Sequence, residues 1–102
     1  MPAYLIAHYN VDDKDLYREY QQGAGAGLRI GTEAKLLVLD PASNQVEGEP
    51  GGVQTVVIEF ESMEKAREIY ESGEYQAVVG KRLQATSLQY AVLCEGFVMP
   101  GQ

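Results

Sequence analysis

Hydrophobic and polar residues follow two different periods along this chain, and the segments with period two predict strands. The segment from Tyr4 to Val11 alternates between two faces that are both largely apolar, which is typical of a strand covered on two sides. We therefore expect it to be central in its sheet. Further strands are predicted at Lys35 to Leu39, Val53 to Phe60 and Gln89 to Gly96, where β-branched and other apolar residues cluster.

Apolar residues at helical spacing occupy the segments between these strands. Asp12 or Asp13 is placed to cap the first helix, and Ser62 to cap a second that begins at Met63. A short additional piece begins at Glu74. The apolar stripes of the three are Leu16, Tyr17, Tyr20 and Ala24; Ala66, Ile69 and Tyr70; and Val78, Val79 and Leu83.

The resulting order, β-α-β-β-α-(α)-β, predicts a ferredoxin-like α+β fold with a four-stranded antiparallel sheet and both helices on one face. The 102 residues suffice for one domain, spanning 1–102. The other face of the sheet would then expose more apolar surface than a soluble monomer carries. We therefore expect a homodimer in which two sheets face each other and form a dimeric α+β barrel.

Composition narrows the range of partners. The net charge of -7, from 15 acidic and 8 basic residues, opposes binding to nucleic acid or to anionic lipid. The start of the chain lacks a basic leader, and no apolar run approaches the roughly 18 residues of a spanning helix, so we expect a cytoplasmic protein without membrane contact. The single cysteine, Cys94, lies in an apolar strand pattern and is expected to be a buried, inert thiol.

The residues from Val53 to Gln76 carry a family resemblance. A strand, the pattern F-x-S, a short helix and the pattern S-x-E-Y-Q follow one another there. This order resembles the domain-of-unknown-function family 1330, small proteins of the dimeric ferredoxin-like barrel class. Further similar segments are Tyr4 to Ala7, Asp13 to Tyr20, Glu59-Phe60, Arg82 and Glu95-Gly96. The resemblance implies the same fold and dimer, and specifies no reaction.

This chain also departs from the family pattern in two places. Many relatives carry His-Gly-Gly before the second strand, where this chain has Ile30-Gly31-Thr32. Relatives also carry a basic residue at the opening of the third strand, where this chain has Gln54. A function that depends on those polar groups is therefore not expected to carry over.

His8 and Glu59 are the predicted catalytic residues. His8 is the only histidine and lies on the expected central strand, where its imidazole can act as a general base or hold a ligand; the alternative is a barrel-wall histidine with one hydrogen bond. Glu59 lies in a β-branched strand, where burial would raise its pKa and suit it to acid or base work. Alternation equally allows Glu59 to face solvent.

Arg82 and three tyrosines are the predicted substrate-binding residues. Arg82 can pair with the carboxylate of a ligand, and the alternative is an ion pair with Glu59 or Glu95. The tyrosines Tyr4, Tyr75 and Tyr90, with Tyr9, suit the lining of a cavity for a small, partly apolar molecule, and equally a dimer interface. We expect His8, Glu59 and Arg82 to share one cavity at the end of the barrel.

No cofactor or metal motif is found. The glycines between Gly23 and Gly27 follow a predicted helix, whereas a phosphate-binding loop precedes one, so we expect a frayed helix end there. One histidine and one cysteine cannot form a zinc cluster, and we expect neither metal nor cofactor; a site made of carboxylates alone is left open.

Two classes of function fit these observations. The first is a small-molecule site in each half of a dimeric barrel, with cofactor-free isomerase or oxygenase chemistry by analogy with the fold class. The second is a non-catalytic dimer that binds a metabolite or a protein through the polar connection from Asp40 to Gly52, which we expect to be the most mobile internal segment.

Overall fold

A computed structural model describes residues 1–101, which form four strands and three helices in one antiparallel sheet packed on a helical layer. The strands are β1 (Ala3–Val11), β2 (Ala34–Asp40), β3 (Gln54–Phe60) and β4 (Thr86–Glu95). The helices are α1 (Lys14–Gly27), α2 (Met63–Tyr70) and α3 (Gly73–Ala85). The strand order is β2-β3-β1-β4, so the predicted ferredoxin-like fold and the central position of the first strand are both confirmed.

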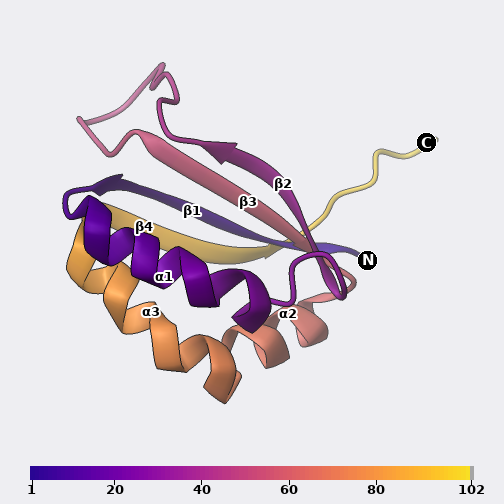
Figure 1. Ribbon diagram of the computed structural model, residues 1–102. Helices are drawn as coiled ribbons and strands as arrows, with labels where there is room; N and C mark the ends of the chain where they lie inside the picture. Colours follow the sequence, from indigo (N-terminus) through magenta and orange to yellow (C-terminus); the bar gives the residue numbers. More distant parts are fainter. Residues whose placement is uncertain (102) are drawn as a thin grey trace.

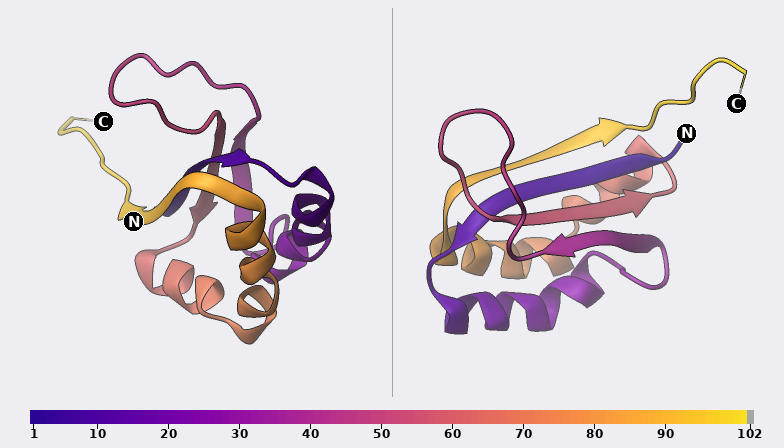
Figure 2. Two further views of the ribbon diagram at one scale, coloured as in Figure 1. Left: turned by 90° about the vertical axis from the view of Figure 1, so that its left-hand side faces the viewer. Right: turned by 90° about the horizontal axis from the view of Figure 1, so that it is seen from above.

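All three helices lie on one side of the sheet, as Figures 1 and 2 show. The burial pattern follows from this arrangement, because alternate residues of β1 and β3 are buried against the helices. The residues of these two strands that face the helices are Ala3, Leu5, Ala7, Tyr9, Gln54, Val56, Ile58 and Phe60. Within residues 1–101 no helix combines the length and the apolar character needed to cross a membrane.

The helix starts are fixed by side-chain caps. The Asp13 carboxylate accepts from the amide of Leu16 at 3.0 Å, and the Ser62 hydroxyl oxygen accepts from the amide of Lys65 at 3.1 Å. The predicted start at Met63 is thus confirmed, and Asp13 rather than Asp12 caps α1. The last helix is longer than expected, at 13 residues.

The glycine segment at the end of α1 corrects one prediction, because it is regular helix through Gly27 and not a frayed end. Gly23 and Gly27 are four residues apart and therefore face the same neighbour, which is α3. A Cβ at Gly23 would stand 2.7 Å from a methyl carbon of Val78, and one at Gly27 would stand 3.1 Å from the Cα of Tyr75. Glycine allows the two helices to approach this closely.

The sheet face away from the helices, here called the open face, has an apolar centre between two polar rows. Strand register brings together one residue from each strand in each row. The central row is Val38, Val57, Ile6 and Val92. One flanking row is Asp40, Thr55, His8 and Tyr90, and the other is Lys35, Glu59, Tyr4 and Cys94.

Alanine substitutions in α1 test the close packing of the two helices. Gly25→Ala should raise the free energy of unfolding by about 0.5–1 kcal/mol, because a Cβ there meets nothing within 4 Å and the unfolded chain loses freedom. Gly27→Ala should lower it by roughly 1–3 kcal/mol, because the Cβ would press on the backbone of α3. Urea denaturation measures both, and equal stabilisation by the two substitutions would contradict this packing.

Candidate functional site

The six residues singled out from the sequence lie on two sides of the sheet. Tyr4, His8 and Glu59 belong to the two polar rows of the open face, together with Tyr90. Arg82 lies on the helical side, where its guanidinium stands 5.5 Å from the centre of the Tyr9 ring. Tyr75 lies there as well, so the structure does not bring the six together into one cavity.

A cluster of tyrosines encloses Arg82 between the helices and the sheet. The side chain of Arg82 is only 4% exposed, its Nη2 donates to the Tyr70 hydroxyl at 3.5 Å, and its guanidinium lies 6.0 Å from the Tyr20 ring centre. Its Nε has no hydrogen-bond partner, and among residues 1–101 no carboxylate forms an ion pair with it. A buried cation therefore rests on aromatic faces and hydroxyl oxygens alone.

Hydrogen bonds tie the tyrosines into two pairs. The hydroxyls of Tyr20 and Tyr75 are 2.7 Å apart, and those of Tyr9 and Tyr17 are 2.6 Å apart. Gln54 donates its side-chain amide to the Tyr17 oxygen at 2.6 Å. Tyr9 and Tyr17 are both buried, and either hydroxyl can donate the bond between them; when Tyr9 donates, Tyr17 accepts both bonds. The hydroxyl proton of Tyr17 is then available to a ligand.

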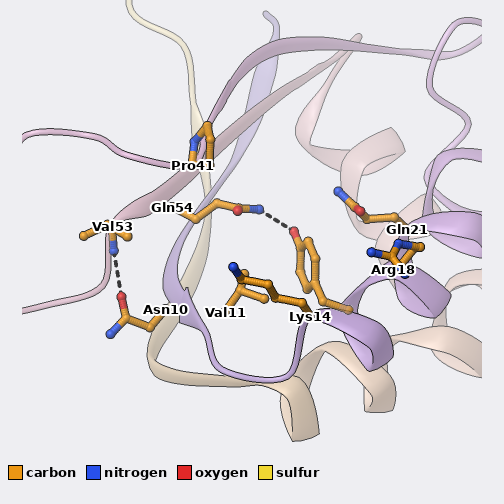
Figure 3. A pocket seen from close by; sticks show the side chains of 9 residues that line it. Asn10, Val11, Lys14, Arg18, Gln21, Pro41, Val53 and Gln54 are labelled. Atoms are coloured by element: carbon orange, nitrogen blue, oxygen red, sulfur yellow. Dashed lines mark hydrogen bonds between the residues drawn. The ribbon is translucent and has the colours of Figure 1, made fainter.

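Two adjoining pockets run along α1, and together they are here called the helix-side groove. The first, of about 450 Å³, is polar at its mouth, where Lys14, Arg18 and Gln21 from α1 lie across from Val53 and Gln54 (Figure 3). The second, of about 240 Å³, is lined mainly by apolar and aromatic side chains of α1, β1, β2 and β3. Tyr17 and Gln21 border both pockets, so a single ligand can reach from one to the other.

The charge of the helix-side groove differs from that of the whole chain. The nine residues that line its polar mouth include Lys14 and Arg18 and no carboxylate, although the chain carries a net charge of -7. Arg18 pairs with the exposed Asp15 at 3.3 Å, while Lys14 forms no ion pair within the described part of the chain. The positive charges in the lining of the groove therefore suit an anionic group.

His8 lies beside a different cavity, of about 480 Å³, under the loop that connects β2 and β3. Its Nδ1 is 3.0 Å from the Thr55 hydroxyl, and its ring centre is 5.7 Å from that of Tyr90. Glu59 is on the same face but pairs in register with Tyr4, four residues from His8 along β1. At about 3.3 Å per residue this separates the two predicted catalytic residues by roughly 13 Å along the strand.

Glu59 and Tyr4 form a local environment of their own at the other end of the open face. The pKa of Tyr4 is raised, first by desolvation and then by the neighbouring charge of Glu59. Among residues 1–101 no group of three or more histidine, cysteine, aspartate or glutamate side chains is arranged to hold a metal ion.

Several residues of these sites were not singled out from the sequence. Tyr17 and Lys14 belong to α1, and only the first was recognised, as part of an apolar stripe. Gln54 was noted only as a departure from the family pattern, although it offered a second signal as a polar residue in the buried phase of β3, in step with Val56 and Ile58. Thr55 carried no such signal, because its contact with His8 depends on strand register.

The tyrosine cluster predicts loss of stability in alkali. Burial is the main cause that raises the pKa of Tyr9, Tyr17, Tyr20 and Tyr75 above the ordinary 10.0. Above about pH 10 the unfolded chain would release protons that the folded cluster keeps, so the free energy of unfolding should fall as pH rises. Below about pH 10 the ionisation of these tyrosines should leave the free energy of unfolding unchanged.

Denaturation at stepped pH, with tyrosinate absorbance as the second readout, measures this effect. Tyrosinate should form in the cluster only as the chain unfolds. Tyr20→Phe should make the free energy of unfolding fall less steeply with pH above about pH 10. An unchanged slope in that variant would contradict the assignment of the effect to the buried tyrosines.

Comparison with solved structures shows the same fold in proteins of low sequence identity. A protein of unknown function from Rhodopseudomonas palustris has a TM-score of 0.76 at 14% identity, over 96% of this chain and 84% of that one. An ethyl tert-butyl ether D (EthD) family protein from Bacillus halodurans has a TM-score of 0.62 at 17% identity, over 95% and 100%. A candidate antibiotic biosynthesis monooxygenase from Nitrosomonas europaea has a TM-score of 0.61 at 11% identity, over 96% and 100%.

No curated protein matches the sequence. The family comparison is decisive, because the sequence model of a domain of unknown function, DUF1330, matches residues 2–97, nearly the whole chain. Together with the ferredoxin-like sheet and helices, this match shows that the chain belongs to the DUF1330 family.

Proposed function

We propose that this protein is a homodimeric, cytoplasmic small-molecule-binding protein, and that its ligand is an amphipathic organic anion held in the helix-side groove. The observation that carries the proposal is the lining of the groove. Its mouth holds Lys14 and Arg18 without a carboxylate in a chain of net charge -7, and it adjoins an apolar compartment. An anionic head and an apolar body would each find a matching environment.

The polar groups at the junction of the two pockets support the same ligand class. The Tyr17 hydroxyl can donate to a carboxylate or carbonyl oxygen, and the Gln54 amide already orients the Tyr17 oxygen. Arg82 lies beneath Tyr9 and Tyr20, whose rings line the apolar compartment, and its unpaired charge adds to the positive potential.

The catalytic form of the proposal is cofactor-free isomerase or oxygenase chemistry. Its support is the likeness of the fold to a candidate monooxygenase, which is an argument from analogy. The alternative is a binding module without turnover. Conversion of a bound ligand, followed by mass spectrometry, distinguishes the two forms.

Binding of trans-cinnamate tests the ligand class, because this probe combines a carboxylate with an apolar ring. It should bind in titration calorimetry, while cinnamyl alcohol and acetate, which each lack one half, should bind more weakly. Lys14→Gln should weaken cinnamate binding by roughly two- to five-fold, as expected for a partly exposed charge worth up to about 1 kcal/mol.

Lys81→Gln is the matched control, because Lys81 pairs with Glu19 at 3.5 Å and does not line the groove. It should leave cinnamate binding unchanged. Equal binding of the acid and the alcohol, or equal losses in the two lysine variants, would overturn the proposal.

The homodimer is supported by the apolar centre of the open face. In the central row Val38 is 39% exposed and Val92 is 46% exposed, both on a face that no helix covers. The segment after β4 adds Phe97 and Val98, which are exposed on a tail that leaves the body of the molecule (Figures 1 and 2). A second copy placed face to face would bury both sets.

Charge placed in the central row tests the homodimer. Sedimentation of the protein at micromolar concentration should give twice the chain mass, with a specific interface burying on the order of 1,200 Å² or more. Val92→Glu should shift the protein to monomer, because it would bury unpaired charge between the two sheets. Gln22→Glu, which adds the same charge on the exposed face of α1, should remain dimeric. A monomeric parent protein would refute the interface.

A further inference from the structure

His8 has a defined protonation pattern because its hydrogen-bond chain ends on a backbone carbonyl. The Ser43 hydroxyl lies 2.6 Å from the Val53 carbonyl oxygen, which can only accept, so Ser43 donates there. The Thr55 hydroxyl is 2.8 Å from the Ser43 oxygen and must be the donor of that bond. With its proton used, Thr55 can only accept from His8, whose Nδ1 is 3.0 Å away. Nδ1 therefore carries a hydrogen.

The second nitrogen of His8 is turned toward the cavity under the loop. His8 Nε2 has no hydrogen-bond partner within residues 1–101, and a Cβ built on Gly51 would stand 3.5 Å from it. When the ring is neutral, Nε2 holds the lone pair. On protonation the Nδ1–H bond to Thr55 is kept, so the chain does not have to rearrange.

The loop above the cavity is held in place by its own side chains. The Gln45 amide group donates to the carbonyls of Glu47 and Glu49 and accepts from the amide of Gly51. The other side of the cavity is formed by Tyr90 and by Leu88, whose backbone is in the left-handed region at φ 50.

We infer that His8 is a proton acceptor, held in its Nδ1–H form by Thr55 and Ser43, and that the adjoining cavity binds a small ligand with a weakly acidic hydrogen. The base abstracts that hydrogen at Nε2 and becomes an imidazolium, and the bonding pair stays on the ligand. The cavity walls include Glu47 and Glu49, so the ligand is uncharged or cationic. This site is on the opposite sheet face from the helix-side groove and does not depend on it.

Titratable and charged groups face His8 from several elements. They are Tyr90 from β4, Glu47 and Glu49 from the loop, and Asp40, which lies beyond Thr55 in the same row. Among residues 1–101, no lysine or arginine lines the cavity.

Nitrogen NMR of the single histidine tests the tautomer directly. With ¹⁵N-labelled histidine, the neutral ring should show a protonated Nδ1 and an unprotonated Nε2, the reverse of the form that free histidine prefers. Ser43→Ala should invert this pattern, because Thr55 then has a proton to donate to Nδ1. Asn44→Ala, which changes a neighbouring cavity residue outside the chain of bonds, should not. A protonated Nε2 in the parent protein would overturn the inference.

Elimination of 5-nitrobenzisoxazole tests the base. The base takes the carbon-bound proton, the C–H electron pair becomes the third bond of the nitrile, and the N–O bond breaks with its electron pair going to oxygen. The ring thereby opens to the coloured 2-cyano-4-nitrophenolate. The rate of elimination with the protein should exceed the rate with an equal concentration of 4-methylimidazole by roughly 10²-fold. His8→Gln should abolish this excess.

Gly51→Ala is the second variant, because it keeps His8 and its bonds but adds a methyl group close to Nε2. It should lower the elimination rate at least several-fold while the NMR pattern of the ring is retained. A rate no greater than that of the free imidazole, or one unchanged in His8→Gln, would overturn the catalytic role.

Discussion

The alternation of side chains along β1 is the constraint on which both candidate sites depend. His8 and Tyr9 are neighbours in the sequence, yet the pleat sends them to opposite faces of the sheet. Tyr9 is thereby buried with Arg82 under the helices, and His8 borders the cavity under the loop. A shift of register by one residue would exchange them and expose the tyrosine cluster. The hydrophobic packing of Leu5 and Ala7 against the helical layer therefore also determines where the chemistry is located.

The burial of Arg82 places a positive charge inside the helical layer, next to the tyrosine cluster. In the described part of the chain no carboxylate pairs with this guanidinium. Burial raises the pKa of each tyrosine in the cluster, and the positive charge of Arg82 lowers it by a smaller amount. The close approach of α1 and α3 at Gly27 brings Tyr75 near Tyr20 and closes the cluster. Helix packing and electrostatics are in this way coupled, because a larger residue in α1 would move the tyrosines away from the cation.

The sequence predicted the fold well because periodicity is a property of short segments. The alternation in Tyr4–Val11 and the cap at Ser62 each required only a few residues, and both are confirmed. The expected grouping of His8 and Arg82 required knowledge of which face each element presents, and that depends on register and helix rotation. The same limitation applies to Gly27, whose close contact with Tyr75 joins residues 48 positions apart in the chain.

A face-to-face dimer would affect the two sites differently, because they lie on opposite faces of the sheet. The central row that a second copy would cover lies between the His8 row and the Glu59 row, so a partner's sheet would approach the His8 cavity from the side. The helix-side groove lies on the far side of the sheet, behind Val56 and Ile58, and would remain open to solvent. Association should therefore alter the His8 cavity far more than the groove. Because the sheet separates the acidic cavity from the basic groove, the ligands proposed for the two sites would not compete directly.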